Sequence, residues 1–174
     1  MPPKSNPQPL THKQVQNIFF RRVAHNWIFP NFSPVGWFEC DLFSVSKAGY
    51  FYEHEIKTSR SDFLNDQHKC RVVDGKERTK YDLLLNGHTK GPSQFYYLVP
   101  QDLLQPEDIP IFAGLKYILT ARNNRLATIK QAPTLHRVKV QEEIVRQIQV
   151  ASYYRFWNER QALSRLQQSV RLKT

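Results

Sequence analysis

The residues best suited to chemistry lie in one short stretch of the 174-residue chain. Four of its 15 carboxylates, Glu39, Asp41, Glu53 and Glu55, lie in this stretch. Lys57 follows two positions after the last of them. Carboxylate oxygens are the ligands that Mg²⁺ and Mn²⁺ prefer, and such an ion polarises a phosphodiester and lowers the pKa of a bound water. A neighbouring ammonium group can hold the attacking water and offset charge on the phosphate. These residue types point to metal-dependent hydrolysis of a phosphodiester.

A β-hairpin must bring these side chains together. Residues 37–45 and 50–57 have the composition of strands, and Lys47-Ala48-Gly49 fits a three-residue loop with Gly49 in the left-handed conformation. Because side chains alternate across a strand, the two glutamates of the second strand share a face with the lysine that ends it.

The length of the loop sets the register of the hairpin. A three-residue loop places Asp41 opposite Glu55 and Glu39 opposite Lys57, whereas a four-residue loop would place Asp41 opposite His54 and scatter the set. Opposed carboxylates destabilise a sheet, so this register favours a cation in their midst. The alternative interpretation is an exposed hairpin with cross-strand ion pairs and no metal.

The flanking segments predict alternating helices and strands. The order favours an α/β (α+β) domain. Helices are expected over 12–25, 60–72 and from 137 onward, strands over 94–99, 116–120 and 125–129, a loop over 26–36, and a charged excursion over 73–93.

We expect one domain with two extensions. Residues 1–10 contain four prolines and read as a flexible N-terminal arm. Residues 11–136 form the expected core, and residues 137–174 a helical extension of the same domain. The long C-terminal helix is a candidate for assembly of a homo-oligomer.

The charge of the chain predicts a polyanionic partner. Lys and Arg number 25, the formal net charge is +10, and there is no acidic residue before Glu39 or over residues 109–141. A basic surface suits DNA, RNA or an anionic membrane, and the acidic cluster within it suggests a divalent cation held close to phosphates. The chain shows no apolar transmembrane stretch and no signal-peptide pattern, and it has two cysteines, so we expect a cytoplasmic protein without a membrane partner.

The spacing of Asp41 and Glu55-Ile56-Lys57 resembles the PD-(D/E)XK nuclease superfamily. The segments around this motif are similar to MmcB-type DNA-repair proteins and their phage-borne relatives. This resemblance implies a restriction-endonuclease-like core, with a central mixed sheet flanked by helices, and a Mg²⁺- or Mn²⁺-dependent deoxyribonuclease. It implies that Asp41, Glu55 and Lys57 are catalytic, and that the Ile56 carbonyl joins the two carboxylates as a metal ligand. The similar segments are residues 55–66, 95–100, 110–115 and 132–136.

One departure from the superfamily pattern concerns the first helix. Many members carry a glutamate there that completes the metal site, and this chain has no carboxylate before Glu39. Gln14, Gln16 or Asn17 can substitute through a water, or Glu39 or Glu53 can fill the gap as auxiliary residues.

Residues just after the motif are candidates for contact with nucleic acid. Ser59 begins a predicted helix, where it either caps the helix or presents amides to a phosphate. Arg60 and Lys69 are expected to contact phosphates, although a solvated surface position explains Lys69 equally well.

The sequence thus predicts a metal-dependent nuclease that hydrolyses DNA phosphodiester bonds in repair, recombination or phage DNA processing, in a bacterial cell or phage-infected host. The alternative is a non-catalytic DNA-binding accessory protein with a nuclease-like fold. A third interpretation is a structural or RNA-associated basic protein that needs no metal.

Overall fold

A computed structural model describes residues 10–73, 75–120 and 123–171. The chain divides into two compact units between Lys139 and Val140. The first is built on a mixed sheet, and the second contains one helix, α4 (Glu142–Arg171). The flexible arm expected over residues 1–10 lies, except for Leu10, outside the described residues. Among the described helices, none has the length and apolar character needed to cross a membrane.

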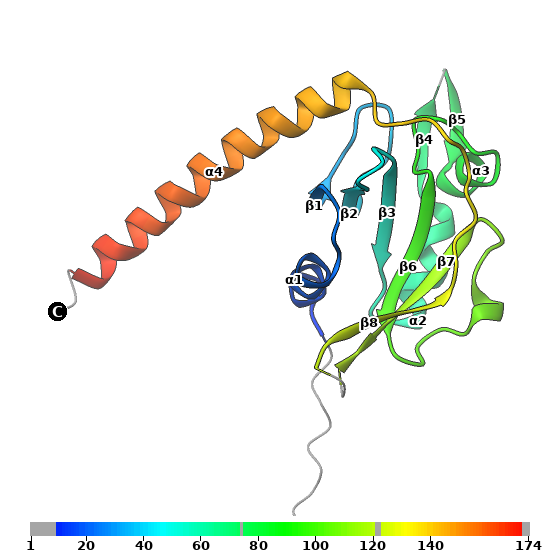
Figure 1. The fold of residues 1–174 in the computed structure, drawn as a ribbon, viewed down its shortest axis with the longest axis horizontal. Coiled ribbons are helices and arrows are strands. Elements are labelled where there is room, and N and C mark those ends of the chain that lie inside the picture. Colours follow the sequence, from blue (N-terminus) through cyan, green and yellow to red (C-terminus); the bar gives the residue numbers. More distant parts are fainter. Residues whose placement is uncertain (1–9, 74, 121–122, 172–174) are drawn as a thin grey trace, which may run out of the picture. The chain divides into compact units, whose positions relative to one another are not determined.

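The sheet of the first unit has six strands, and Figure 1 shows it with helices packed around it. The three central strands run parallel, and the outer ones pair antiparallel. The expected α/β fold, a central mixed sheet flanked by helices, is therefore confirmed. In spatial order the strands are β1 (Trp27–Phe32), β2 (Cys40–Val45), β3 (Phe51–Ile56), β6 (Gln94–Pro100), β7 (Ala113–Leu119) and β8 (Arg125–Lys130).

Helix α1 (His12–Arg22) covers one face of the sheet. Its buried residues Val15 and Phe19 enter the main hydrophobic cluster. Thr11 and Gln14 form the expected capping box, which satisfies amides at the helix start, although the helix ends at Arg22 rather than at residue 25. The strand residues of the cluster are Leu42, Ile56, Leu98 and Ile118.

Two short helices, α2 (Arg60–Asn65) and α3 (Lys80–Leu85), cover the opposite face. Phe63 of α2 packs edge-on against Tyr97 of β6, with ring centroids 4.9 Å apart. The hydroxyl of Tyr81 in α3 lies 2.7 Å from that of Tyr97. This face holds the acidic residues of β3, because Glu53 and Glu55 alternate with residues that point toward α1.

The segment 26–36, expected to be a loop, contains the edge strand β1. This segment contains Pro30, and proline disfavours a strand. Proline lacks an N–H to donate, but an edge strand has one side without a partner, so the residue is tolerated there.

The helix expected over 60–72 and the excursion over 73–93 are also corrected. Helix α2 stops at Asn65, and a 3₁₀ turn (Asp66–His68) leads into a two-stranded hairpin. The dipeptide Asp74-Gly75 is a two-residue turn signal, and Gly75 has a positive φ of 74°. The hairpin strands are β4 (Cys70–Val73) and β5 (Lys76–Thr79).

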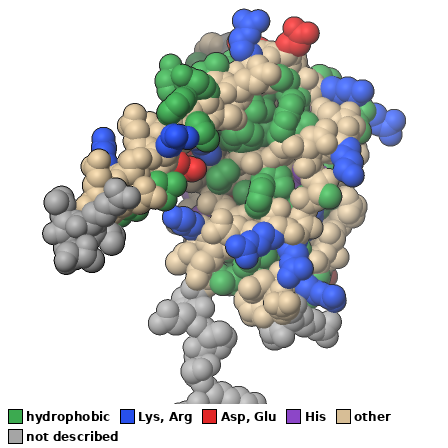
Figure 2. Space-filling model, turned by 60° about the vertical axis from the view of Figure 1, so that its left-hand side comes forward, with side chains coloured by type: hydrophobic (Ala, Val, Ile, Leu, Met, Phe, Trp, Pro, Cys, Tyr) green, Lys and Arg blue, Asp and Glu red, His purple; other side chains and the backbone are tan. Residues whose placement is uncertain are grey.

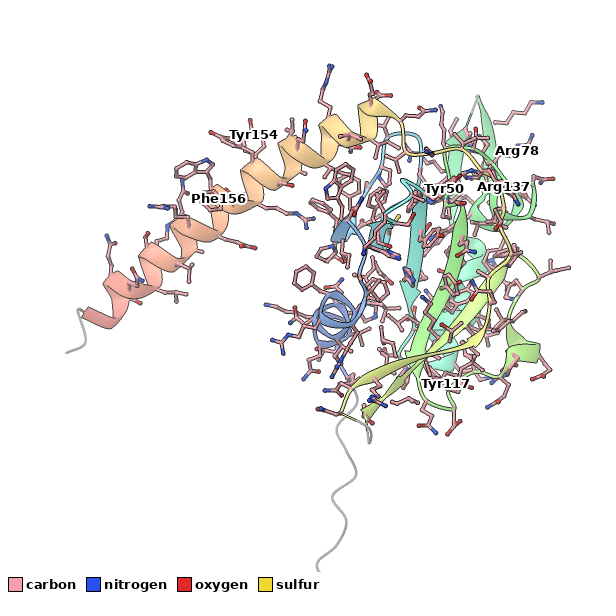
Figure 3. All side chains as sticks on the ribbon, viewed as in Figure 1. Tyr50, Arg78, Tyr117, Arg137, Tyr154 and Phe156 are labelled. Atoms are coloured by element: carbon pink, nitrogen blue, oxygen red, sulfur yellow. The ribbon has the colours of Figure 1, made fainter. Side chains whose placement is uncertain are left out.

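Helix α4 forms the second unit. It carries exposed aromatic side chains, among them Tyr154 and Phe156, which Figure 3 labels. Its expected role in assembly of a homo-oligomer stays a prediction.

A buried histidine lies on the α1 face of β3. His54 has no exposed surface, its ring stacks on Tyr96 at 5.3 Å between centroids, and Phe19 packs on it. Both ring nitrogens lack a hydrogen-bond partner among the described residues. Burial, with the nearby charges of Lys116 and His25, lowers the pKa of His54 well below 6.5.

This burial predicts acid-sensitive stability. The unfolded chain takes up a proton at His54 near pH 6.5 and the folded chain does not, so the free energy of unfolding falls as the pH drops below that value. The slope from this residue is at most about 1.4 kcal/mol per pH unit. Urea unfolding at pH 8 and pH 5 should show a smaller loss for His54→Phe than for wild type. The exposed His68→Asn should keep the wild-type loss, and an equal loss in His54→Phe would refute the assignment.

Candidate active site

The register of the β2–β3 hairpin brings Asp41 and Glu55 together. Leu42 pairs with His54, and the next position places Asp41 opposite Glu55, as a three-residue loop requires. Gly49 has the expected positive φ, 88°. The Asp41 Oδ2 atom accepts a 2.8 Å hydrogen bond from the amide of Ile56, which fixes the carboxylate across the two strands. The expected register is confirmed.

Glu55 is buried and surrounded by three lysines. Its Oε1 atom forms ion pairs with Lys57, at 3.1 Å, and with Lys69. Its Oε2 atom lies 3.0 Å from the ammonium of Lys80. Burial alone would raise the pKa of Glu55, but the lysine charges outweigh it and hold the pKa far below its usual value. Glu55 is therefore a carboxylate at any physiological pH.

Lys57 lies between two carboxylates. Its ammonium is 3.1 Å from Glu55 and 2.9 Å from Asp66 Oδ1. Burial would lower the pKa of Lys57, but these two negative charges raise it. Lys57 is therefore charged, and it acts as a hydrogen-bond donor and positive charge rather than as a general base.

Asp66 is a site residue that sequence reasoning missed. It is buried in the 3₁₀ turn after α2, and its Oδ2 atom accepts a 3.1 Å hydrogen bond from the Tyr97 hydroxyl. Its Oδ1 atom pairs with Lys57 and, at 2.8 Å, with Lys69. The expected helix over 60–72 concealed this residue, because a continuous helix gives no reason to single it out.

Lys80, at the start of α3, is the second residue that the sequence did not reveal. Its side chain has no exposed surface and lies 2.6 Å from Glu53 Oε1 and 3.0 Å from Glu55 Oε2. Glu53 Oε2 also accepts a 2.7 Å hydrogen bond from the Trp37 indole. Burial raises the pKa of Glu53, and Lys80 opposes that rise. Glu53 thus belongs to a buried ion-pair network.

Asp41 differs from the other carboxylates of the cluster. The three lysine ammonium groups make their ion pairs with Glu53, Glu55, Asp62 and Asp66 rather than with Asp41. Burial and the charge of Glu55 raise the pKa of Asp41 above its usual value. A cation beside Asp41 and Glu55 would relieve this repulsion.

Asp41, Glu55 and Lys57 meet in an open pocket of about 170 Å³. His12, the first residue of α1, lies at the same pocket, and sequence reasoning missed it because it searched that helix for a carboxylate. The remaining lining residues are Asp62, Asn65, Asp66 and Lys69.

Several predicted site residues lie elsewhere. Glu39 is exposed, precedes β2 and is not among the residues that line the pocket. The Gln16 amide donates to the Asn31 side chain and, at 3.1 Å, to the Asp41 carbonyl. Gln16 therefore contacts the backbone of β2. The Ile56 side chain packs in the core on the α1 face, and the predicted role of its backbone carbonyl as a metal ligand stays a prediction.

The three residues predicted to contact nucleic acid do not lie together at the pocket. Ser59 caps α2, because its hydroxyl accepts a hydrogen bond from the Asp62 amide at 3.2 Å. Arg60 forms an exposed ion pair with Asp108. Only Lys69 of the three lies at the pocket.

The donor set suits a divalent cation held partly by solvent and phosphate. No group of three or more His, Cys, Asp and Glu side chains in the described ranges is arranged to hold a metal. Mg²⁺ commonly uses one or two carboxylates and completes its shell with water and phosphate oxygens. Asp41 and Glu55 supply that minimum, provided that the Lys69 ammonium leaves Glu55 Oε1 and the ion then shares this oxygen with Lys57.

The comparisons with known proteins establish the fold alone. No family model matches the chain, and no curated protein matches it. A solved structure, the SPO1766 protein of unknown function from Silicibacter pomeroyi, is similar with a TM-score of 0.54 and 16% identity. The likeness covers 76% of this chain and 78% of that one.

Lys80→Met tests the buried network. It leaves two glutamates without their shared cation, so we expect a loss of about 3–5 kcal/mol in the free energy of unfolding. The double variant Lys80→Met/Glu53→Gln removes one charge of each sign and should recover part of that loss. Urea unfolding measures both. A loss below about 1 kcal/mol in the single variant would show that Lys80 is solvated rather than buried.

Proposed function

We propose that the chain is a Mg²⁺- or Mn²⁺-dependent nuclease of the PD-(D/E)XK superfamily that hydrolyses DNA phosphodiester bonds, in repair, recombination or phage DNA processing. The observation that carries this proposal is the meeting of Asp41, Glu55 and Lys57 in one open pocket. The spacing of these three residues in a sequence occurs often by chance. A hairpin register that also brings their side chains to one pocket makes the match more specific.

Each residue has a role that its surroundings support. Asp41 and Glu55, with the Ile56 carbonyl, would hold the ion, which when bound activates a water and offsets charge on the phosphate. Lys57 is charged, so it donates hydrogen bonds to the water or to the phosphate oxygens.

A nucleic acid is favoured as the substrate because the chain is strongly basic, and the resemblance to DNA-repair proteins selects DNA. The net charge is +10, and Lys and Arg side chains are spread over the face that Figure 2 shows, where acidic side chains are sparse. Binding to phosphates releases counterions, so affinity for DNA should fall steeply with salt.

Cleavage of circular, linear and branched DNA tests the proposed activity. Cutting should occur with Mg²⁺ or Mn²⁺ and stop with EDTA. Glu55→Gln and Lys57→Met should each lower the rate by about 10²-fold or more, since the first removes a carboxylate that would hold the ion and the second removes a positive charge at the reacting phosphate. The exposed Asp102→Asn should cut at the wild-type rate. Wild-type cutting by Glu55→Gln would exclude this pocket as the active site.

A non-catalytic DNA-binding accessory protein is the second candidate. The ion pairs of Lys69 favour it, because its ammonium sits against both Glu55 and Asp66 and neutralises the pocket without a metal. From α1 the pocket is lined by His12 rather than by a carboxylate.

A calorimetric titration with Mn²⁺ separates the candidates. A nuclease site predicts saturable binding that Asp41→Asn abolishes. Lys69→Met should bind Mn²⁺ about fivefold more tightly, because about 1 kcal/mol of charge repulsion is removed. The exposed Lys47→Met is the matched control and should leave affinity unchanged. An absence of binding in wild type and in Lys69→Met would favour the accessory protein.

A further inference from the structure

The β4–β5 hairpin has one strongly basic face. Arg71 pairs with Arg78 and Val73 with Lys76, so these four side chains share a face of the ribbon. The opposite face carries Cys70, Val72, Glu77 and Thr79. The strand residues of the ribbon are exposed except Val73 and Thr79, which are half-buried. The ribbon forms a sheet separate from the main one.

Directly opposed arginines are unfavourable in an antiparallel ribbon unless an anion lies between them or one turns aside. Arg71 turns aside, because its guanidinium donates to the Trp37 carbonyl. Arg78 and Lys76 instead line a hollow of about 460 Å³ between the ribbon and α3. Figure 3 labels Arg78 on this ribbon.

Among the described residues that line the hollow, Arg78 and Lys76 are positive and Asp82 is negative. The described lining therefore carries more positive than negative charge. The His88 ring also lines the hollow and stacks on Trp37 at 6.3 Å, and its Nδ1 atom is buried without a hydrogen-bond partner among the described residues. A buried polar atom without a partner is rare.

The residues that flank the ribbon on both sides form ion pairs with Glu55. Lys69 precedes β4 and pairs with Glu55, and Lys80 follows β5 and pairs with the same carboxylate. The Lys80 amide donates a 2.8 Å hydrogen bond to the Lys69 carbonyl, which closes the base of the ribbon. The ribbon therefore lies between two lysines that form ion pairs with Glu55.

We propose that this hollow binds a backbone phosphate of duplex DNA and is an anchoring site separate from the carboxylate pocket. Arg78 and Lys76 supply the positive charge. A two-stranded ribbon has the width that a DNA groove admits, which favours duplex DNA over a free phosphate ion. The choice of DNA rests on the proposed function, but binding at the hollow requires neither a metal nor cleavage.

Binding of a fluorescent duplex, followed by anisotropy in EDTA, tests this site. Arg78→Gln/Lys76→Gln should weaken the Kd about tenfold at low salt and reduce the slope of log K against log salt by about two, because two phosphate contacts are lost. Arg125→Gln/Lys47→Gln removes the same charge from exposed positions on β8 and the β2–β3 turn, and it should keep the wild-type slope. Thermal unfolding should show that both double variants fold.

The outcomes separate this site from the proposed activity. The anchoring site would be overturned if Arg78→Gln/Lys76→Gln kept the wild-type salt slope and affinity. It would also be overturned if the two double variants lost affinity equally. Both conclusions hold even where Glu55→Gln abolishes cutting. Weakened binding confined to Arg78→Gln/Lys76→Gln supports it, even where no DNA is cut under any condition. Inorganic phosphate should compete no better than sodium chloride of equal ionic strength. Stronger competition, seen in wild type and absent in the hairpin variant, would identify a site for free phosphate instead.

Discussion

The first unit depends on one buried ammonium group, that of Lys80. Removing such a group from water costs several kcal/mol, and only close, well-oriented carboxylates offset that cost. Glu53 and Glu55 do so from the same face of β3, at 2.6 and 3.0 Å. The hairpin and α3, which flank Lys80, are therefore tied to the central strand by charge as well as by apolar packing.

This ion pair also determines the protonation of the pocket. Because Lys80 pairs with Glu55 from the buried side, Glu55 stays ionised although it is almost wholly buried. Ionised Glu55 then keeps Lys57 charged and raises the pKa of Asp41. The carboxylate of Asp41 is thus the group at which an added cation would gain most, since its neighbours already have their partners.

The sequence was sufficient for the parts of the site that local rules govern. Gly49 and a three-residue loop determine the hairpin register, and alternation then brings Asp41, Glu55 and Lys57 to one face. Asp66 and Lys80 escaped prediction because they arrive from other elements. Their side chains are charged and would ordinarily be read as solvated, and only the tertiary fold reveals that they are buried.

The same limit explains the errors in secondary structure. Pro30 disfavours a strand in general, and only its place at the sheet edge makes β1 acceptable. The segment after Asn65 has a helical composition, but Asp66 gains more from Lys57 and Tyr97 in a 3₁₀ turn than it would on a longer helix. Tertiary ion pairs outweighed local propensity at this point.

Lys69 decides how the site would work as a nuclease. Its side chain is 40% exposed, whereas those of Lys57 and Lys80 are 3% and 0% exposed. Withdrawing Lys69 into water therefore costs little desolvation, and it leaves Lys57 as the remaining ammonium on Glu55 Oε1 and Asp66 Oδ1. On the proposed function, a DNA phosphate that pairs with Lys69 would favour cation binding at the pocket, and this coupling is reciprocal by thermodynamic necessity.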